Sequence, residues 1–207
     1  TQFIKSNLVG NGVVKITDTE IKDWSKDDGE VAMKDIVAVT SLAFLNKSNA
    51  SGATPATIDP RLEVVEKLWA HISQIEGFGE KRSKEITVAA QPVMLKALAK
   101  LTYDFNFSNR KPENGHLLFQ KLVSSIENID FSHSNPIWRY YELTDDEVQR
   151  YGLYDLKTWL PSTEGNANRD VGSFQNGQMR FGAKHNDIFP ILADMIRFQV
   201  GLPSRHA

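Results

Sequence analysis

The sequence contains no cysteine. This absence excludes disulfides, iron–sulfur clusters, zinc sites with thiolate ligands and a cysteine nucleophile, and it is typical of proteins from a reducing compartment. No apolar run approaches the roughly 20 residues of a membrane-spanning helix. The first residues, TQFIKSNLVG, lack the long apolar centre of a signal peptide. We therefore expect a cytoplasmic protein without a membrane partner.

An excess of basic charge is also missing. The 207 residues carry a formal net charge of −2 and the pI is near 6.2, which argues against a surface made for indiscriminate DNA binding. A local basic face is still compatible with this balance. The last 39 residues hold five basic and three acidic side chains: Arg169, Arg180, Lys184, Arg197 and Arg205 against Asp170, Asp187 and Asp194.

Helical spacing of apolar residues dominates the rest of the chain, in which 41% of residues are hydrophobic. Asp59 followed by Pro60 predicts a helix start, and Gly77 and Gly79 predict its end. A capping box, Thr144 to Glu147, predicts a short helix that Gly152 closes. Further helical segments are expected at 31–49, at 83–105 with Pro92 as a kink or a first turn, at 116–129, at 153–160 and from about Asp187 to Val200.

Two turn signals predict small β-hairpins. Asn176-Gly177 lies between two short alternating runs at 173–181, and Gly10-Asn11-Gly12 lies between apolar stretches within 1–24. The expected fold is therefore α+β, predominantly α-helical, with one or two small hairpins. The polar stretch 47–57 resembles a linker. It divides a hairpin and buried helix at 1–46 from a helical domain at 58–207, or it is a mobile loop within one domain.

Motifs with a defined chemistry are weak. GFGEKRSK at 77–84 does not fit a phosphate-binding loop, but Lys81, Arg82 and Lys84 would suit a phosphate backbone as well as a solvated loop. Ser132-His133-Ser134 is not a catalytic set, because a triad is assembled in space. The pairs His185 with Asp187 and Asp130 with His133 are too loose for a dedicated metal site. Neither a metal nor another cofactor is expected.

The cluster at 180–197, RFGAKHNDIFPILADMIR, is the strongest candidate site. If Asn186 or Asp187 caps the last helix, Lys184 and His185 lie beside the N–H groups of its first turn, where anions such as phosphate are stabilised. The alternative is an ordinary helix cap with Arg180 and Lys184 merely solvated.

Three segments resemble the C-terminal region of DNA sulfur-modification proteins of the DndB type, in the DGQHR group linked to DNA phosphorothioation. They are IDFSHSNPIWR (129–139), NANRDVGSF (166–174) and MRFGAKHNDIFPILADMIRFQVGLP (179–203), with LNKSNASGAT (45–54) as a weaker match. The signature Asp-Gly-Gln-His-Arg is absent; Asn176-Gly-Gln-Met-Arg180 only echoes it. The resemblance implies a bacterial protein of a DNA-modification and restriction cluster that binds DNA and represses its own operon, corresponding to the later part of a longer family member.

Three hypotheses follow, with binding or regulation favoured over catalysis. The first is a module that binds double-stranded DNA, and other modification proteins besides, with phosphate contacts from Arg180, Lys184, His185, Asn186, Arg197, Lys81, Arg82 and Lys84. The second is a metal-dependent nucleic-acid-processing or nucleotide-hydrolysing enzyme of the same cluster, with a metal on Asp170, His185 and Asp187. The third is a structural or protein-interaction module in which these groups only cap and tie the fold.

Overall fold

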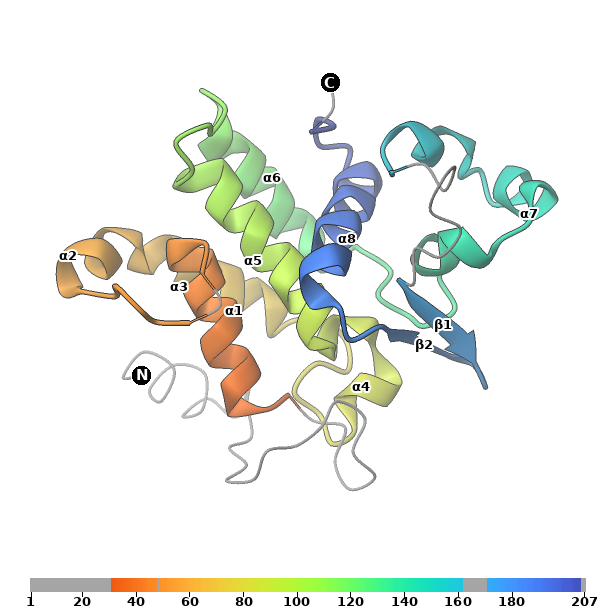
Figure 1. Cartoon of the computed structure of the whole chain (residues 1–207), viewed down its shortest axis with the longest axis horizontal. Helices are drawn as coiled ribbons and strands as arrows, with labels where there is room; N and C mark the ends of the chain where they lie inside the picture. The colour runs from red at the N-terminus through yellow and green to blue at the C-terminus, as the bar shows by residue number, and fades with distance from the viewer. Residues whose placement is uncertain (1–30, 48, 162–170, 206–207) are drawn as a thin grey trace.

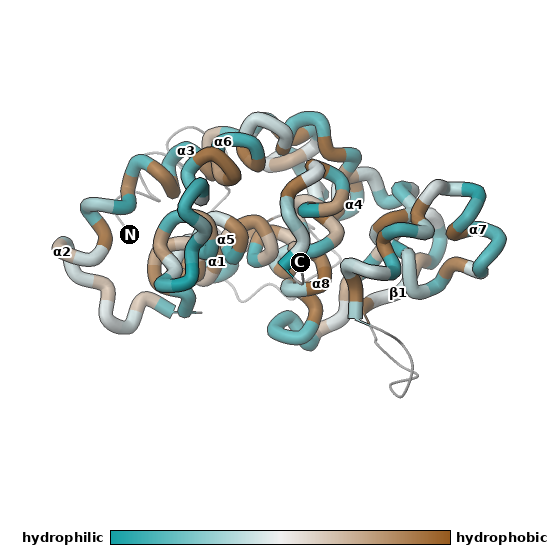
Figure 2. Tube along the Cα trace, turned by 90° about the horizontal axis from the view of Figure 1, so that it is seen from above, coloured by the Kyte–Doolittle hydropathy of each residue, from teal (hydrophilic) through white to brown (hydrophobic). Residues whose placement is uncertain are grey.

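Helix α5 (Pro92–Asn106) is the centre of the fold, and the other long helices pack around it. The computed structural model describes residues 31–47, 49–161 and 171–205. Figure 1 shows α5 between α1 (Met33–Leu45) on one side and α8 (His185–Val200) on the other, with α6 (Gly115–Ile126) alongside. Hydrophobic residues alternate with hydrophilic ones along these helices in the hydropathy view of Figure 2, and the buried ones form one core cluster. The expected fold class, α+β and mainly helical, is confirmed.

Helix α1 is the buried helix expected within 31–49. Its buried residues lie on most of its circumference, because α5 covers one side and α3 (Leu62–Ile72) touches another. Trp69 of α3 donates from its indole nitrogen to the hydroxyl of Thr40 at 3.2 Å, which satisfies both polar groups inside the core. Asn46 ends α1 in the left-handed conformation, with φ of 56°, a conformation that asparagine tolerates.

The expected helix start at Asp59 is wrong. The chain turns into a helix earlier, at α2 (Pro55–Ile58), where Thr54 and Thr57 form a reciprocal capping box and Pro55 takes the first helical position. Asp59–Arg61 continues this turn as a 3₁₀ segment that leads directly into α3. The stretch 47–57 is therefore partly helical, because threonine at Thr54 and Thr57 can cap a turn as well as populate a loop.

Proline Pro92 occupies the first turn of α5 and does not kink it. The preceding segment expected to share its helix is instead a separate short turn, α4 (Ser83–Ile86), followed by a 3₁₀ turn at Val88–Ala90. A proline disfavours the α conformation at the residue before it. Gln91 accordingly has φ and ψ of −75° and 133° and separates the two helical segments.

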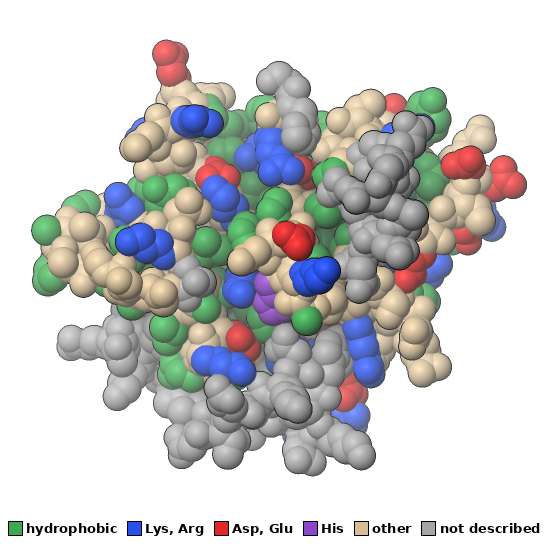
Figure 3. Space-filling view, viewed as in Figure 1, with side chains coloured by type: hydrophobic (Ala, Val, Ile, Leu, Met, Phe, Trp, Pro, Cys, Tyr) green, Lys and Arg blue, Asp and Glu red, His purple; other side chains and the backbone are tan. Residues whose placement is uncertain are grey.

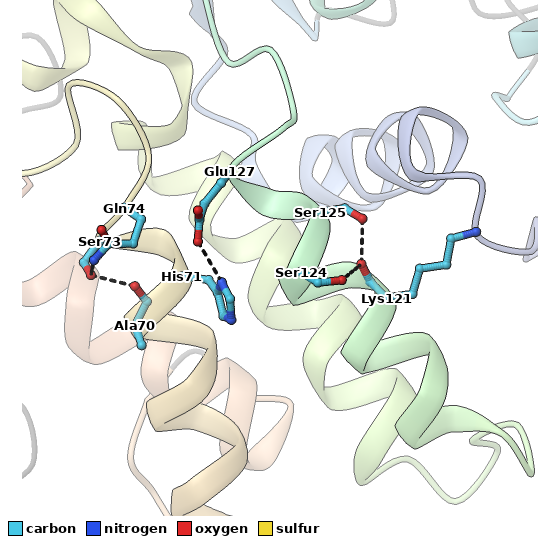
Figure 4. Close-up of polar contacts among 8 residues, drawn as sticks. All are labelled: Ala70, His71, Ser73, Gln74, Lys121, Ser124, Ser125 and Glu127. Carbon is cyan, nitrogen blue, oxygen red and sulfur yellow. Dashed lines mark hydrogen bonds and ion pairs between the residues drawn. The ribbon is translucent and has the colours of Figure 1, made fainter.

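Two polar contacts join α6 to its neighbours. Figure 4 shows His71 of α3 facing Glu127 at the end of α6, with 3.1 Å between the imidazole Nδ1 and a carboxylate oxygen. Lys121 of α6 reaches the end of α8 and donates to the carbonyl of Gly201 at 2.7 Å. At its start α6 passes so close to α5 that a Cβ on Gly115 would lie 2.1 Å from the carbonyl oxygen of Phe105, so only glycine fits there.

The segment IDFSHSNPIWR folds back on itself after α6. The carbonyl of Asp130 accepts from the Asn135 amide at 2.7 Å and from the Trp138 indole at 3.0 Å. The ring of Phe131 stacks on Trp138, with 5.9 Å between ring centroids. A 3₁₀ segment (Pro136–Glu142) follows, and its N-cap is Asn135. These contacts close the segment into a turn that leads the chain toward α7.

The remaining elements extend one end of the molecule. The capping box at Thr144 opens α7 (Asp145–Arg150) as predicted, and Gly152 follows it with a positive φ of 68°. A 3₁₀ turn (Tyr154–Thr158) takes the place of the expected segment 153–160. Figures 1 and 2 show α7 beside the hairpin of β1 (Gly172–Gln175) and β2 (Gln178–Phe181), opposite the end that holds α2.

The hairpin at Asn176-Gly177 is confirmed, with antiparallel pairing of Ser173 to Arg180 and positive φ at both turn residues. The hairpin expected around Gly10–Gly12 lies outside the described residues. Within the described ranges, no helix is both long and apolar enough to cross a membrane.

Candidate nucleic-acid interface

The hairpin places Arg180 on an exposed position of β2, and three residues after that strand the chain reaches Lys184 and α8. Both side chains are exposed. Arg180 donates to the side chain of Gln178 at 3.2 Å, a contact within the same strand. Two cations of the predicted cluster therefore lie on the surface where β2 passes into α8.

Buried side chains form hydrogen bonds with the edge of β2 that does not pair with β1. The Gln91 amide donates to the carbonyl of Met179 at 2.9 Å and accepts from the N–H of Phe181 at 3.0 Å. The Met179 N–H donates to Nδ1 of His133 at 3.0 Å. A buried backbone group without a partner is strongly unfavourable. Gln91 and His133 thus satisfy the outer edge of β2 and fix the hairpin to the helical core.

The opposite edge of the hairpin is held by the segment before α7. The carboxylate of Glu142 accepts from the N–H of Phe174 at 3.0 Å. The guanidinium of Arg139 lies over the Phe174 ring, 4.3 Å from its centroid. Since both edges are bonded to other elements, the position of Arg180 is set by the core and not by the hairpin alone.

The start of α8 differs from the expected one. The helix begins at His185 and its N-cap is Lys184, which makes no side-chain capping bond. Asn186 and Asp187 therefore lie inside the first turn, and the expected cap at either residue is wrong. The carbonyl of Lys184 accepts from the N–H groups of Asp187 at 3.0 Å and Ile188 at 3.2 Å, so the first turn closes without a capping side chain.

His185 faces α5 and contacts a lysine. The Nζ atom of Lys96 lies 3.1 Å from Nδ1 of His185. An ammonium group only donates hydrogen bonds, so Nδ1 carries the acceptor lone pair in this contact. That lone pair is then not available to a metal ion. Of the other two members of the metal hypothesis, Asp187 is exposed on α8, and Asp170 lies outside the described residues. Over the described ranges, no group of three or more potential metal ligands is found.

A polar cavity of about 490 Å³ opens between α1, the loop that follows it, α5 and the start of α8. Its lining residues are Ala38, Leu42, Asn46, Lys47, Asn49, Ser51, Lys96, Asn186 and Phe189. Figure 3 shows basic side chains spread over the face that carries these helices, with acidic ones between them. The cavity adds Lys47 and Lys96 to the cations near Asn186, so this side of the molecule suits an anion.

A second cavity has the opposite character. It has a volume of about 280 Å³ and is lined by Ile75, Glu76, Ile86, Thr87, Glu127, Ile129, Asp130, Phe131 and Ser132. Three carboxylates line it, and the described part of its wall has no lysine or arginine. A phosphate group would be repelled there. Of the two cavities, the one beside α8 is the candidate for phosphate.

The second predicted basic cluster is only partly on the surface. Lys81 and Arg82 are exposed, and Arg82 pairs with the carboxylate of Glu85 at 2.6 Å. Lys84 is fully buried, with no exposed surface. A buried ammonium cannot touch a nucleic-acid backbone, so the expected phosphate contact of Lys84 is not supported. The loop therefore offers a nucleic acid the ammonium of Lys81, together with the guanidinium of Arg82, whose charge is balanced in part by Glu85.

Arg197 is also an interior residue, with 9% of its surface exposed. Its guanidinium donates to the carbonyl of Pro203 at 2.9 Å and lies over the ring of Phe105 at 4.8 Å. Burial lowers the pKa of Arg197, while the nearby carboxylates of Asp194 and Asp104 raise it. The expected DNA contact at Arg197 is therefore not supported, and this residue ties the end of α8 to the core.

Sequence reasoning missed Lys47, Lys96 and Asn49 of the cavity. Lys96 belongs to α5, whose pattern indicates only a core helix, and its approach to His185 spans 89 residues. The one signal near Lys47 and Asn49 was the polar run LNKSNASGAT, which matched the DndB type weakly. Local periodicity of apolar residues does not indicate a contact between residues so far apart in the sequence.

A comparison with protein families finds a match to DndB, DNA-sulfur modification-associated, over residues 11–193. No curated protein and no solved structure matches the chain. The family match covers most of the sequence, including the turn at 129–139, the hairpin and the first half of α8. The chain belongs to the DndB family of DNA-sulfur modification-associated proteins.

Proposed function

We propose that this protein binds double-stranded DNA in the cytoplasm and acts as a repressor-like regulator of a phosphorothioate-modification cluster. The observation that carries the proposal is the pair of exposed cations, Arg180 and Lys184, at the junction of β2 and α8. Membership in a DNA-sulfur modification family makes DNA the substrate class to expect at such a surface. Phosphate contacts of this kind position a protein on the duplex without reading its sequence.

Exposed residues on neighbouring elements extend this surface. The segment 129–139 joins the two parts, because His133 accepts from the Met179 N–H of β2 and the carbonyl of Phe131 accepts from the N–H of Val88, which follows α4. The exposed Lys81 and Arg82 lie immediately before α4. A duplex lying across β2 would thus meet Arg180 and Lys184 first and the loop at Lys81 beside them.

The overall acidity of the chain sets the expected affinity. With a net charge of −2, non-specific attraction is weak, and binding depends on the few cations of this surface. Removing a side chain that neutralises one phosphate reduces the slope of log affinity against log salt by about 0.9. A double variant that removes Arg180 and Lys184 should therefore bind more weakly and show a slope smaller by about two.

The test is fluorescence anisotropy with a labelled duplex from the promoter of its own gene cluster, titrated at rising salt. The variant Arg180→Ala with Lys184→Ala is compared with Lys67→Ala and Lys157→Ala, which remove the same charge from exposed positions on α3 and the turn after α7. We expect loss of affinity in the first pair alone. No binding at low salt, or equal binding by both double variants, would reject the proposal.

A further inference from the structure

The cavity between α1 and α8 has the size of a small-ligand site. Its volume of about 490 Å³ lies within the range of about 300–1,000 Å³ typical of such pockets. Its walls come from α1 and described residues of the loop that follows it, from Lys96 of α5 and from the first turns of α8. A ligand there would contact α1 and α8, the two helices that pack against the central helix α5.

The charged side chains among the described lining residues of the cavity are all basic. Lys47 and Lys96 line it, and among the described lining residues there is no carboxylate. Lys96 is half-buried and its ammonium is held 3.1 Å from Nδ1 of His185. The acceptor role of Nδ1 is compatible with a neutral imidazole and a charged lysine. Two ammonium groups on one cavity favour a ligand that carries negative charge.

Amide and hydroxyl groups complete the polar part of the wall. Asn46, Asn49, Ser51 and Asn186 all line the cavity. The side-chain oxygen of Asn49 accepts from the N–H of Ser51 at 2.9 Å, a turn that fixes the loop. With its oxygen used inside the loop, the Asn49 amide can offer a ligand its Nδ2 donors, which suit an oxyanion.

The remaining wall is apolar and includes an aromatic ring. Ala38 and Leu42 of α1 lie opposite Phe189 of α8, which is half-buried. A partly exposed ring at the side of a basic cavity can stack on the flat face of a base. The combination of cations, amide donors and one aromatic wall matches a molecule with a phosphate at one end and a planar ring at the other.

We propose that this cavity binds a mononucleotide, with the phosphate on Lys47 and Lys96 and the base against Phe189. The site is distinct from the exposed pair Arg180 and Lys184 of the proposed DNA surface, and it does not depend on that surface. A free nucleotide and the phosphorylated end of a DNA strand present the same chemistry to these residues, and the experiment below distinguishes them.

The test is isothermal titration calorimetry of the whole chain with deoxyadenosine monophosphate, without DNA present. We expect saturable binding that Lys96→Met and Lys47→Met each weaken about tenfold, the effect of removing one charged hydrogen bond. Lys67→Met, an exposed lysine of α3, should leave the affinity unchanged. Because Lys47 is exposed in a loop, its variant tests the site even if Lys96→Met fails to fold.

Two comparisons separate the parts of the ligand. Deoxyadenosine, which lacks the phosphate, should bind much more weakly than the nucleotide. Phe189→Leu should lower the affinity for the nucleotide and leave the affinity for inorganic phosphate unchanged. A 5′-phosphorylated single strand that competes with the nucleotide would assign the site to a DNA end, and the absence of competition would assign it to a free nucleotide. No saturable binding, or binding that neither lysine variant weakens, would overturn the proposal whatever the duplex measurements show.

Discussion

Nδ1 of His133 lies 3.0 Å from the backbone nitrogen of Met179, and this contact joins the loop after α6 to strand β2 across 46 residues of sequence. The Met179 carbonyl is meanwhile occupied by the Gln91 amide. The same Nδ1 also lies 3.1 Å from that carbonyl oxygen, and as an acceptor it takes the Met179 N–H while Nε2 carries the ring proton. The imidazole thus holds the backbone of Met179, the residue that precedes the exposed Arg180.

We predict that the protein loses stability as the pH falls below about 6.5, the ordinary pKa of histidine. Burial lowers the pKa of His133, and the charge of Arg180 lowers it further, against backbone contacts with Met179, Lys84 and Glu85 that raise it. The unfolded chain then takes up a proton at a higher pH than the folded chain does. Stability is complete above pH 6.5 and declines from there toward the lowered folded pKa.

Urea unfolding at pH 7.5 and pH 5.5 measures this effect. His133→Gln should reduce stability at the higher pH, because its amide cannot reproduce the imidazole geometry, and it should flatten the dependence between the two values. His116→Gln, at an exposed position of α6, is the control. An equal pH dependence in all three proteins would contradict the assignment.

Gly172→Ala should destabilise the hairpin. A Cβ at this position would lie 2.2 Å from the carbonyl oxygen of Arg180, and φ is 150°. We expect a loss of roughly 1–3 kcal/mol in the free energy of unfolding. Gly152→Ala is the matched control, because its φ of 68° is also positive but a Cβ there meets no atom within 4 Å. A larger loss for the control would show that contact with β2 is not decisive.

Asn186→Ala should change the free energy of unfolding by less than about 0.5 kcal/mol, as for most surface substitutions. The reason is that Asn186 lies inside the first turn and does not cap α8. Thr144→Ala removes a true capping side chain from α7 and should lower stability by about 1 kcal/mol. Thermal unfolding of both variants compares them directly, and equal losses would restore Asn186 as the cap.

Arg197→Met should destabilise the protein by roughly 1–3 kcal/mol, because it removes a hydrogen bond of a charged group and a cation–π contact made by a buried guanidinium. The variant loses the bond to Pro203 and leaves the buried carboxylate of Asp194 with Arg205 as its ion partner, at 2.7 Å. Urea unfolding is the measurement, with the exposed Arg110→Met as control. A stable variant with a reduced salt slope for DNA would instead return Arg197 to the DNA surface.

Local signals predicted local structure well. The capping box at Thr144, the hairpin at Asn176-Gly177 and the buried helix α1 each depend on neighbours a few residues apart, and each is confirmed. Asp59 and Asn186 were assigned wrongly as caps for one physical reason. Several nearby polar residues can satisfy the first N–H groups of a helix, and packing decides where the helix begins.

The candidate site could be predicted only in part. Of the predicted lysines, Lys184 is exposed and Lys84 is buried. Of the predicted arginines, Arg180 is exposed and Arg197 is buried. The long stems of lysine and arginine can pack inside when a partner receives the charged end. No periodicity of the chain distinguishes these cases, because the partners come from distant segments.

The sequence by itself determined the absence of thiol chemistry, the helical character, the hairpin and the resemblance to DndB, since residue types and short spacings carry these properties. Tertiary structure alone decided which cations face the solvent. It brought Lys96 to His185 and placed Lys47 and Asn186 around one cavity. It also placed Gln91 and His133 where they hold β2. These relationships depend on the packing of α5 against α1 and α8. Burial and long-range hydrogen bonding arise from that packing and have no local counterpart in the chain.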